Sequence, residues 1–376
     1  MELKKYRFDE VTINFDKRRV PLSGAQRERR PGKYRYYGAQ GIIDHIDDFI
    51  FDGTYLLIAE DGENLKSKKQ NIAQVVDGQF WVNNHAHVVQ GNELCDTRYL
   101  CYLLNSMDLS GYITGSAQPK LSQANLNAVT MFLPSIDEQK KIIEYLYTLD
   151  KKIVVNQRIN DNLYAQAKAI FDNHFINIDA IPAGWRKGNL LDIANYLNGL
   201  AMQKFRPQGN EIGLPVLKIK ELRQGSCDDS SELCSLSIKP EYIIHDGDVV
   251  FSWSGSLLVD IWCGGTCGLN QHLFKVTSDV YDKWFYYLWT AHHLARFIAI
   301  AADKATTMGH IKREELAKAE VLIPCEEDYT SLNSIMQPIF ELIISNRIES
   351  RKLAAFRDEL LPKLMSGEVD VSGVQL

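Results

Sequence analysis

The longest regular pattern of apolar residues in this chain lies between Pro134 and about Phe175. Apolar side chains return there every three or four residues, which predicts roughly ten turns of one amphipathic helix. No Gly or Pro interrupts the pattern, and Ser135 followed by Glu138 has the spacing of an N-terminal capping box. The predicted stripe consists of Ile142, Leu146, Leu149, Ile153, Asn156, Ile159, Leu163, Ala167 and Ile170.

A second pattern of the same kind runs from Tyr329 to about Met365. A single amphipathic helix of this length is not stable in water unless its apolar face is covered, so we predict that the two helices form an intramolecular coiled coil. Each carries an Asn near its middle, where a buried amide would fix the register at some cost in stability. The second stripe consists of Ile335, Ile339, Leu342, Asn346, Leu353, Phe356, Leu360 and Leu364.

The residues before each long helix also repeat. Short, turn-punctuated apolar runs before residue 133 are typical of strands, and the same order of elements begins again near residue 179. The corresponding segments are 49–58 with 242–251, 83–89 with 270–276, 99–104 with 284–289, 116–122 with 303–311 and 131–134 with 321–324. The loops of the two copies differ in composition, as expected if one scaffold reads two different ligands of one chemical class.

These patterns predict an α+β protein with a pseudo-two-fold internal repeat. Two similar globular modules are separated by two long helices. The predicted parts are a first module over 1–133, a central helix over 134–178, a second module over 179–324, and a C-terminal helix and tail over 325–376.

Composition changes this picture little. The chain has 376 residues, with apolar, aromatic and charged fractions ordinary for a soluble globular protein. It contains no run of eighteen apolar residues, its first residues have no hydrophobic signal core, and its seven cysteines are scattered. We therefore expect a cytoplasmic location and a reducing environment.

Charge distribution is more informative than the net charge of −6, which by itself argues against a nucleic-acid partner. Eight basic residues and one acid lie between Lys17 and Arg35. Such a run is often a solvated face. Interleaved Tyr34, Tyr36 and Tyr37 favour binding, because rings and basic groups together can meet bases and phosphates.

Catalytic motifs are missing. The sequence has no Gly-x-Ser-x-Gly, Walker, Gly-x-Gly-x-x-Gly or His-Glu-x-x-His pattern, and no motif of the amino-methyltransferases. Cys263, Cys267 and His272 lack a fourth ligand at a convincing spacing, so we predict no metal site. His85 and His272 occupy matched positions beside strands, where a structural role is favoured over catalysis.

The remaining candidate chemistry is binding chemistry on loops, where basic groups could meet phosphates and polar groups could reach base edges. For each residue the alternative is plain solvation. In the first module the candidates are Arg27, Arg29, Arg30, Lys33, Arg35, Tyr36, Asn64, Lys66, Lys68, Lys69, Gln118, Lys120 and Ser122. In the second they are Lys218, Lys220, Arg223, Ser252, Trp253, Ser254, Ser256, Lys304, Thr306, Thr307, His310 and Lys312.

The whole chain resembles the specificity subunits of type I restriction-modification enzymes. The resemblance rests on the repeated module-plus-helix order, on the helix opening Asp137-Glu-Gln-Lys-Lys-Ile-Ile and on the closing segment Arg357-Asp-Glu-Leu-Leu-Pro-Lys-Leu-Met-Ser-Gly-Glu-Val. The second helix departs from the pattern, since it opens with Glu326-Glu-Asp-Tyr-Thr.

The resemblance implies a non-catalytic chain in which each module recognises one half of a split double-stranded DNA target. It also implies that the two helices pack antiparallel, set the spacer and dock two methyltransferase subunits, with restriction (translocase) subunits joining for cleavage. S-adenosylmethionine and ATP with Mg²⁺ would belong to those partners, and no cofactor would belong to this chain. The rival interpretations are an enzyme with its own active site and a non-enzymatic scaffold whose modules bind protein.

Overall fold

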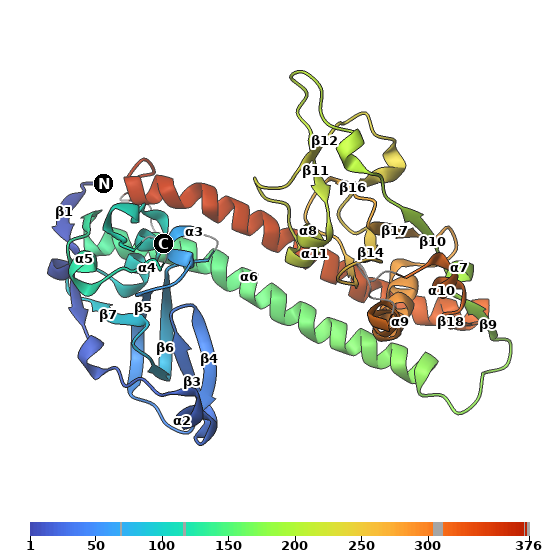
Figure 1. The fold of residues 1–376 in the computed structure, drawn as a ribbon, viewed down its shortest axis with the longest axis horizontal. Helices are drawn as coiled ribbons and strands as arrows, with labels where there is room; N and C mark the ends of the chain where they lie inside the picture. The colour runs from blue at the N-terminus through green and yellow to red at the C-terminus, as the bar shows by residue number, and fades with distance from the viewer. Residues whose placement is uncertain (68–69, 116–117, 304–310, 372, 374–376) are drawn as a thin grey trace. The chain divides into compact units, whose positions relative to one another are not determined.

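The computed structural model describes residues 1–67, 70–115, 118–303, 311–371 and 373. Its contacts divide into two units, Met1–Asp150 together with Ala355–Leu376, and Lys151–Ala354. Both long helices contribute to both units (Figure 1). Each unit therefore holds one module together with one part of the helix pair.

The first unit begins with a strand that pairs with the last strand before the long helix. Its elements are β1 (Lys4–Arg7), α1 (Phe8–Val11), β2 (Thr12–Asn14), η1 (Asp16–Arg18), α2 (Gly24–Glu28), β3 (Pro31–Gly38), β4 (Gly41–Ile46), β5 (Phe51–Ala59), α3 (Asn64–Ser67), β6 (Ala73–Val82), β7 (Ala86–Gly91), α4 (Thr97–Ser106), η2 (Ser110–Tyr112), α5 (Gln123–Asn127) and β8 (Thr130–Leu133). β1 and β8 form an antiparallel pair.

A six-stranded sheet in the order β2-β7-β5-β6-β3-β4 forms the body of this module. Its strands are antiparallel except for the β3–β6 pair. Helix α4 begins where Asp96 accepts hydrogen bonds from the N–H groups of Arg98 and Tyr99, and its apolar face packs into the core beside β5 and β7. That core also contains Ile142 and Leu146 of the central helix.

The second unit has the same plan. Its elements are β9 (Arg186–Asn189), α7 (Leu190–Ile193), β10 (Asn195–Asn198), η4 (Met202–Lys204), β11 (Leu214–Leu217), α8 (Ile219–Gln224), β12 (Leu233–Cys234), η5 (Pro240–Tyr242), β13 (Ile243–Ile244), β14 (Val249–Ser252), β15 (Leu258–Ile261), β16 (Cys267–Leu269), β17 (Leu273–Thr277), α9 (Lys283–Asp303), α10 (Arg313–Ala317) and β18 (Glu320–Ile323). β9 pairs with β18 as β1 pairs with β8.

The sheet order confirms the internal repeat. Strands β10-β17-β14-β15 follow one another as β2-β7-β5-β6 do in the first module. The second module adds a separate sheet, β12-β11-β16-β13, which has no counterpart in that order. The α+β class and the two sheet-rich modules predicted from the sequence are therefore confirmed.

The two long helices are α6 (Ile136–Phe171), which continues into the π-helical turn η3 (Asp172–Ile176), and α11 (Glu326–Ser366). The predicted capping box is present, since the Glu138 N–H donates to Ser135 Oγ and the Ser135 N–H donates to the Glu138 carboxylate. In the second unit Lys152 pairs with Glu349, while Asn160 bonds the Ile343 carbonyl. Residue numbers thus rise along one helix as they fall along the other, so the helices are antiparallel.

The predicted stripe on α11 is wrong in part. Ile335, Leu342 and Phe356 are exposed, with accessible fractions of 50%, 46% and 55%, and Ile159 on α6 is also exposed. Asn346 and Leu364 of the predicted stripe are buried, and so are Leu332, Met336, Phe340, Ile343 and Met365, which the stripe did not contain. The buried face of α11 differs from the predicted stripe because α11 packs on α9 as well as on α6. The Phe340 ring of α11 contacts the Tyr287 ring of α9.

The other predicted seam residues lie where expected. Ile142, Leu146, Asn156 and Asn346 are buried, and Leu149, Ile153, Leu163, Ile339, Leu353 and Leu360 are half-buried. Within the described ranges, no helix combines the length and apolarity that a membrane crossing requires.

Candidate nucleic-acid interface

The basic run of the first module extends from η1 through α2 to β3, and three of its eight cations, Arg19, Arg27 and Arg30, form ion pairs with described residues. Arg27 bonds Asp44 at 2.9 Å, and Arg30 bonds Asp47 at 2.8 Å. Arg35 donates to the Asp77 carbonyl oxygen at 2.6 Å. Asp44 lies on β4 and Asp47 directly after it, so the fold neutralises part of the basic surplus of this run.

Two predicted residues of this run stay exposed without an ion pair to any residue that the structure describes, Arg29 at the end of α2 and Lys33 on β3. Tyr36 is a correction, because it is fully buried. Its hydroxyl accepts from the Leu22 N–H at 2.8 Å, and its ring lies under the Arg27 guanidinium. The sheet is covered on both faces at this point, and the Tyr36 ring packs with Ile46 and Trp81 in the core, where it is closed to a base.

Two loop segments that carry predicted DNA-binding residues, 60–66 and 118–122, lie side by side. We name them together the first loop surface. Asp61 and Lys120 form a β-bridge, and the Leu121 N–H donates to the Glu60 carbonyl at 2.8 Å. Lys66, Gln118 and Lys120 are exposed there, while Ser122 caps α5. Figure 1 shows α3, which contributes to this surface, at the opposite end of the module from α2.

Asn64 is the other correction in the first module. Only 2% of its surface is accessible, and neither polar atom of its side-chain amide has a hydrogen-bond partner. The residue begins α3 and faces inward beside Leu65, so it is not placed to meet a base edge in this conformation.

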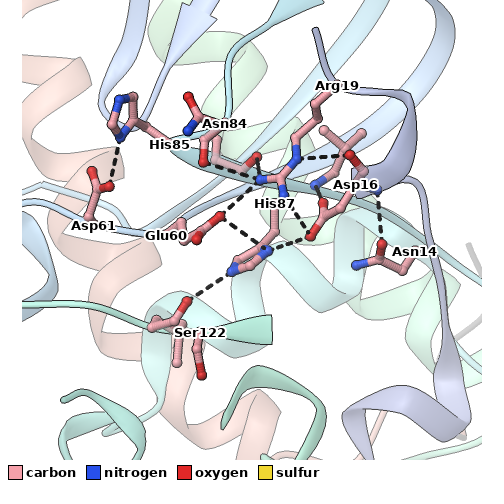
Figure 2. A network of polar contacts seen from close by, with 12 residues as sticks. Asn14, Asp16, Arg19, Glu60, Asp61, Asn84, His85, His87 and Ser122 are labelled. Atoms are coloured by element: carbon pink, nitrogen blue, oxygen red, sulfur yellow. Dashed lines mark hydrogen bonds and ion pairs between the residues drawn. The ribbon is translucent and has the colours of Figure 1, made fainter. Parts of the chain in front are cut away.

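A buried network of charged side chains supports the first loop surface (Figure 2). His87 Nδ1 lies 2.6 Å from Asp16 Oδ2, and His87 Nε2 lies 2.8 Å from the Leu121 carbonyl oxygen. Arg19 bonds Glu60 at 2.9 Å, and Glu60 also pairs with Lys120 at 3.2 Å. The network therefore connects β7 and η1 to both segments of the surface.

The two carboxylates of this network are held in their ionised form. Burial alone would raise the pKa of Asp16, but hydrogen bonds from His87 and from the Val88 N–H hold that pKa below its usual value. Burial likewise opposes ionisation of Glu60, and bonds from Arg19 and Lys120 with the nearby His87 lower its pKa. Both groups can therefore only accept hydrogen bonds near neutral pH.

In the second module the predicted cations cluster around α8. Lys218 pairs with Glu232, and Lys220 bonds Ser230 at 2.8 Å and Asp228 at 3.4 Å. Arg223 is exposed at the end of the same helix. One exposed cation and two locally paired ones thus remain on this face.

The Trp253 loop forms the second loop surface, which comprises 253–256 and 311–312. The Trp253 N–H donates to the His272 carbonyl, and the Ile311 N–H donates to the Trp253 carbonyl at 3.1 Å. Ser256 and Lys312 are exposed and Trp253 is half-buried. Ser252 and Ser254 are corrections, because both are buried. Ser252 ends β14 facing inward, and Ser254 bonds His272 Nδ1 at 3.0 Å.

Six predicted DNA-binding residues lie outside the described residues, namely Lys68, Lys69, Lys304, Thr306, Thr307 and His310. In the part of the chain that the structure describes, no three His, Cys, Asp or Glu side chains come together as metal ligands. The charged support of the first loop surface was not predicted. Its sequence signal is His87 itself, a titratable residue within an apolar strand that is buried on both faces.

Comparison with known proteins agrees with this architecture. Residues 2–165 match the family described as the type I restriction modification DNA specificity domain. The MjaIX specificity subunit of Methanocaldococcus jannaschii is 27% identical over 304 residues, which cover 73% of this chain and 69% of that protein. The HindI specificity subunit of Haemophilus influenzae is 18% identical, with 90% and 89% of the two chains covered.

A solved structure has the same fold. The type I restriction-modification S subunit from M. genitalium superposes with a TM-score of 0.62 at 14% identity, covering 99% of this chain and 97% of that one. Together with the repeated strand order and the antiparallel helix pair, these matches make the chain similar in sequence and in fold to the specificity subunits of type I restriction-modification systems.

Proposed function

We propose that this chain recognises a bipartite sequence in double-stranded DNA, with one half read by residues 1–133 and the other by residues 179–324. In this proposal the helix pair sets the number of unread base pairs between the halves. The modules would act as readers for the methyltransferase and restriction subunits of the assembly.

One observation carries this proposal. The two modules share the strand order β2-β7-β5-β6 and β10-β17-β14-β15, yet their loop surfaces differ in chemistry. The first presents Lys66, Gln118 and Lys120 over a charged network, and the second presents Lys312 and Trp253, whose ring packs on His272 and Phe274. Equivalent scaffolds with unlike loops are suited to two different half-sites of one polymer.

Within the predicted set, the exposed residues are the proposed DNA contacts. In the first module these are Arg29, Lys33, Lys66, Gln118 and Lys120. In the second they are Lys220, Arg223, Ser256 and Lys312, and the half-buried Trp253 is added to them. Since several cations are paired within the chain, much of the phosphate binding would come from partner subunits, in keeping with the net charge of −6.

The helix pair is the proposed docking surface for two methyltransferase subunits. In the second unit Val154, Val155 and Ile159 on α6, with Ile335 and Leu342 on α11, leave apolar surface exposed. Apolar surface concentrated on paired helices is typical of a protein interface. S-adenosylmethionine and ATP with Mg²⁺ would be bound by those partner subunits and by the restriction subunits.

Mapping methylated bases in a cell that carries this chain with its methyltransferase subunits tests the proposal. The expected result is one motif made of two specified halves and an unspecified spacer of constant length, absent when the gene for this chain is deleted. A continuous motif, or a motif that survives the deletion, would refute it.

A further inference from the structure

The three-residue turn that precedes β7 has a counterpart before β17 in the second module. Each turn has the sequence Asn-x-His, as Asn83-Asn84-His85 in the first module and as Asn270-Gln271-His272 in the second. Strand pairing confirms the match, because the residue that follows each turn, Ala86 or Leu273, pairs with the last residue of β5 or β14. The two turns are therefore equivalent parts of the repeated scaffold.

The first and third residues of each turn hold its backbone. The buried Asn83 accepts the His85 N–H on its side-chain oxygen at 2.8 Å, and the buried Asn270 accepts the His272 N–H at 3.3 Å. The backbone N–H groups of both Asn residues donate to carbonyl groups on β3 and β11. Bonding its own turn in this way is the usual role of an Asn at such a position. The side chain of the middle residue is therefore not needed to hold the turn.

Both turns are bonded to the loop surfaces in the same way. The His85 carbonyl accepts the Glu60 N–H at 2.9 Å, and the His272 carbonyl accepts the Trp253 N–H at 3.4 Å. Glu60 and Trp253 are bonded in turn to the other segment of each surface. In the first module the His85 ring also bonds Asp61 at 2.7 Å (Figure 2). Each turn thus lies directly beside the loop surface of its module.

The middle residue of each turn carries a side-chain amide. Asn84 is exposed, its carbonyl accepts from Arg19 at 3.3 Å, and its amide has no hydrogen bond to any described residue. Gln271 is half-buried, with Nε2 3.3 Å from Nε2 of His272, whose Nδ1 lies 3.0 Å from Ser254 Oγ. The second hydrogen on the Gln271 nitrogen and the amide oxygen remain for a ligand. Each module therefore presents one amide, with a donor and an acceptor side by side.

We propose that Asn84 and Gln271 each read one adenine of the DNA target, Asn84 in one half and Gln271 in the other. The inference rests on the proposed function and deepens it, by naming one specificity-determining residue in each module. A carboxamide donates to adenine N7 while it accepts from adenine N6, and no other single base presents such an acceptor and donor in the major groove. Lys120 and Lys312 on the adjoining surfaces would contact phosphates, which position a module without carrying sequence information.

The test uses the full-length chain assembled with its methyltransferase subunits. Methylated bases are mapped for the unaltered complex and for the variants Asn84→Ala and Gln271→Ala. Asn84→Ala should make one A·T position of one half unspecified, and Gln271→Ala should do the same in the other half. The readout is the ratio of kcat/KM on the target duplex to kcat/KM on a duplex with that pair changed. Loss of a bidentate contact should lower this ratio roughly tenfold to a hundredfold.

The analogue 7-deazaadenine separates direct reading from an indirect effect on the module. It replaces N7 by carbon and still pairs with thymine. At the position that Asn84→Ala relaxes, the analogue should lower kcat/KM of the unaltered complex roughly tenfold. The Asn84→Ala complex should not respond to it, because the contact is already lost. An equal response of the two complexes would overturn the inference.

Two further variants test the role of the amide itself. Asn84→Asp keeps the shape and the acceptor but loses the donor, so it should relax the same position as Asn84→Ala. Gln79→Ala removes an exposed amide of β6, which bonds Asp52 at 3.0 Å, and it should leave the motif unchanged. Both substituted side chains are exposed, so the variants should fold as the unaltered chain does.

The inference is overturned if both alanine variants keep the motif, if they relax the same half, or if a relaxed pair is G·C. A loss of methylation that is uniform over all positions would indicate a phosphate contact and would overturn it as well. In these cases the unaltered complex still methylates a bipartite motif, so the proposed function stands. An unaltered complex without a bipartite motif would overturn both.

Discussion

Asn346 donates its side-chain amide to Asn160 Oδ1 at 2.9 Å, across the antiparallel helix pair of the second unit. Asn160 in turn donates to the Ile343 carbonyl at 3.2 Å. Beside them Asn156 donates to Glu349 at 2.7 Å. Buried amides that bond across a helix seam tie the pair to a single register, because a shift by one turn would leave them unsatisfied.

Replacing only one of the two bonded residues, Asn160 or Asn346, should destabilise the protein more than replacing both. Asn346→Leu leaves the Asn160 amide oxygen buried without a donor, and we expect it to lower the free energy of unfolding by roughly 2 kcal/mol. The double variant Asn160→Leu/Asn346→Leu should recover most of that loss. Denaturant unfolding of the single and the double variant measures these losses, and Asn162→Leu, at an exposed position, is the control. Additive losses in the double variant would contradict the coupling.

Arg347 holds the second module to its helix through a bidentate pair with Asp260, at 2.9 and 2.7 Å. Both side chains are largely shielded from solvent, so Arg347→Ala should lower the free energy of unfolding by roughly 2 kcal/mol. The exchanged pair Arg347→Asp/Asp260→Arg should regain part of it. Arg158→Ala, at an exposed position of α6, is the matched control. If Arg158→Ala and Arg347→Ala lowered the free energy of unfolding equally, the stabilising role of the Arg347–Asp260 pair would be contradicted.

Helix length should determine the spacer. Four residues inserted within 151–162 of α6 lengthen a helix by about 6 Å, which corresponds to roughly two base-pair steps. We expect methylation mapping to find a changed spacer between unchanged halves. The same insertion in the turn at 181–184, outside the helix, should leave the spacer as it is. Altered halves with the original spacer would refute the relationship.

Docking of methyltransferase subunits should depend on the exposed apolar residues of α11. Ile335→Glu and Leu342→Glu place a charge on surface that is already accessible, so the chain should fold normally while co-purification with methyltransferase subunits falls at least about tenfold. Ser334→Glu adds the same charge at an exposed polar position and serves as control. Undiminished assembly of both apolar variants would locate the interface elsewhere.

Acid should weaken the first module through Asp16. Its pKa is lowered in the folded state, so its contribution to stability is present above the unfolded value of about 4 and is lost as the pH falls through the folded value. Asp16→Asn should therefore be less stable than the unaltered chain at neutral pH, and the difference in free energy of unfolding should shrink below about pH 4. A difference independent of pH would exclude this linkage. Asp9→Asn, at an exposed carboxylate, is the control.

The pattern of apolar positions was enough to determine the α+β class, the repeat, the two helices and the capping box at Ser135. These features depend on local periodicity, which the order of residues carries directly. The same pattern also identified Asn156 and Asn346 as buried amides. It misplaced the buried face of α11, because burial of Met336 and Phe340 depends on packing against α9, a contact between segments about fifty residues apart.

Only the tertiary structure decided which charges remain available. Arg27 and Arg30 look like free cations in the sequence, yet β4 and the turn that follows it bring Asp44 and Asp47 against them. Likewise, the His87 ring meets the Asp16 carboxylate and the Leu121 carbonyl only because folding places them on either side of it. Charge pairing acts through distance in space, and the order of residues along the chain does not specify that distance.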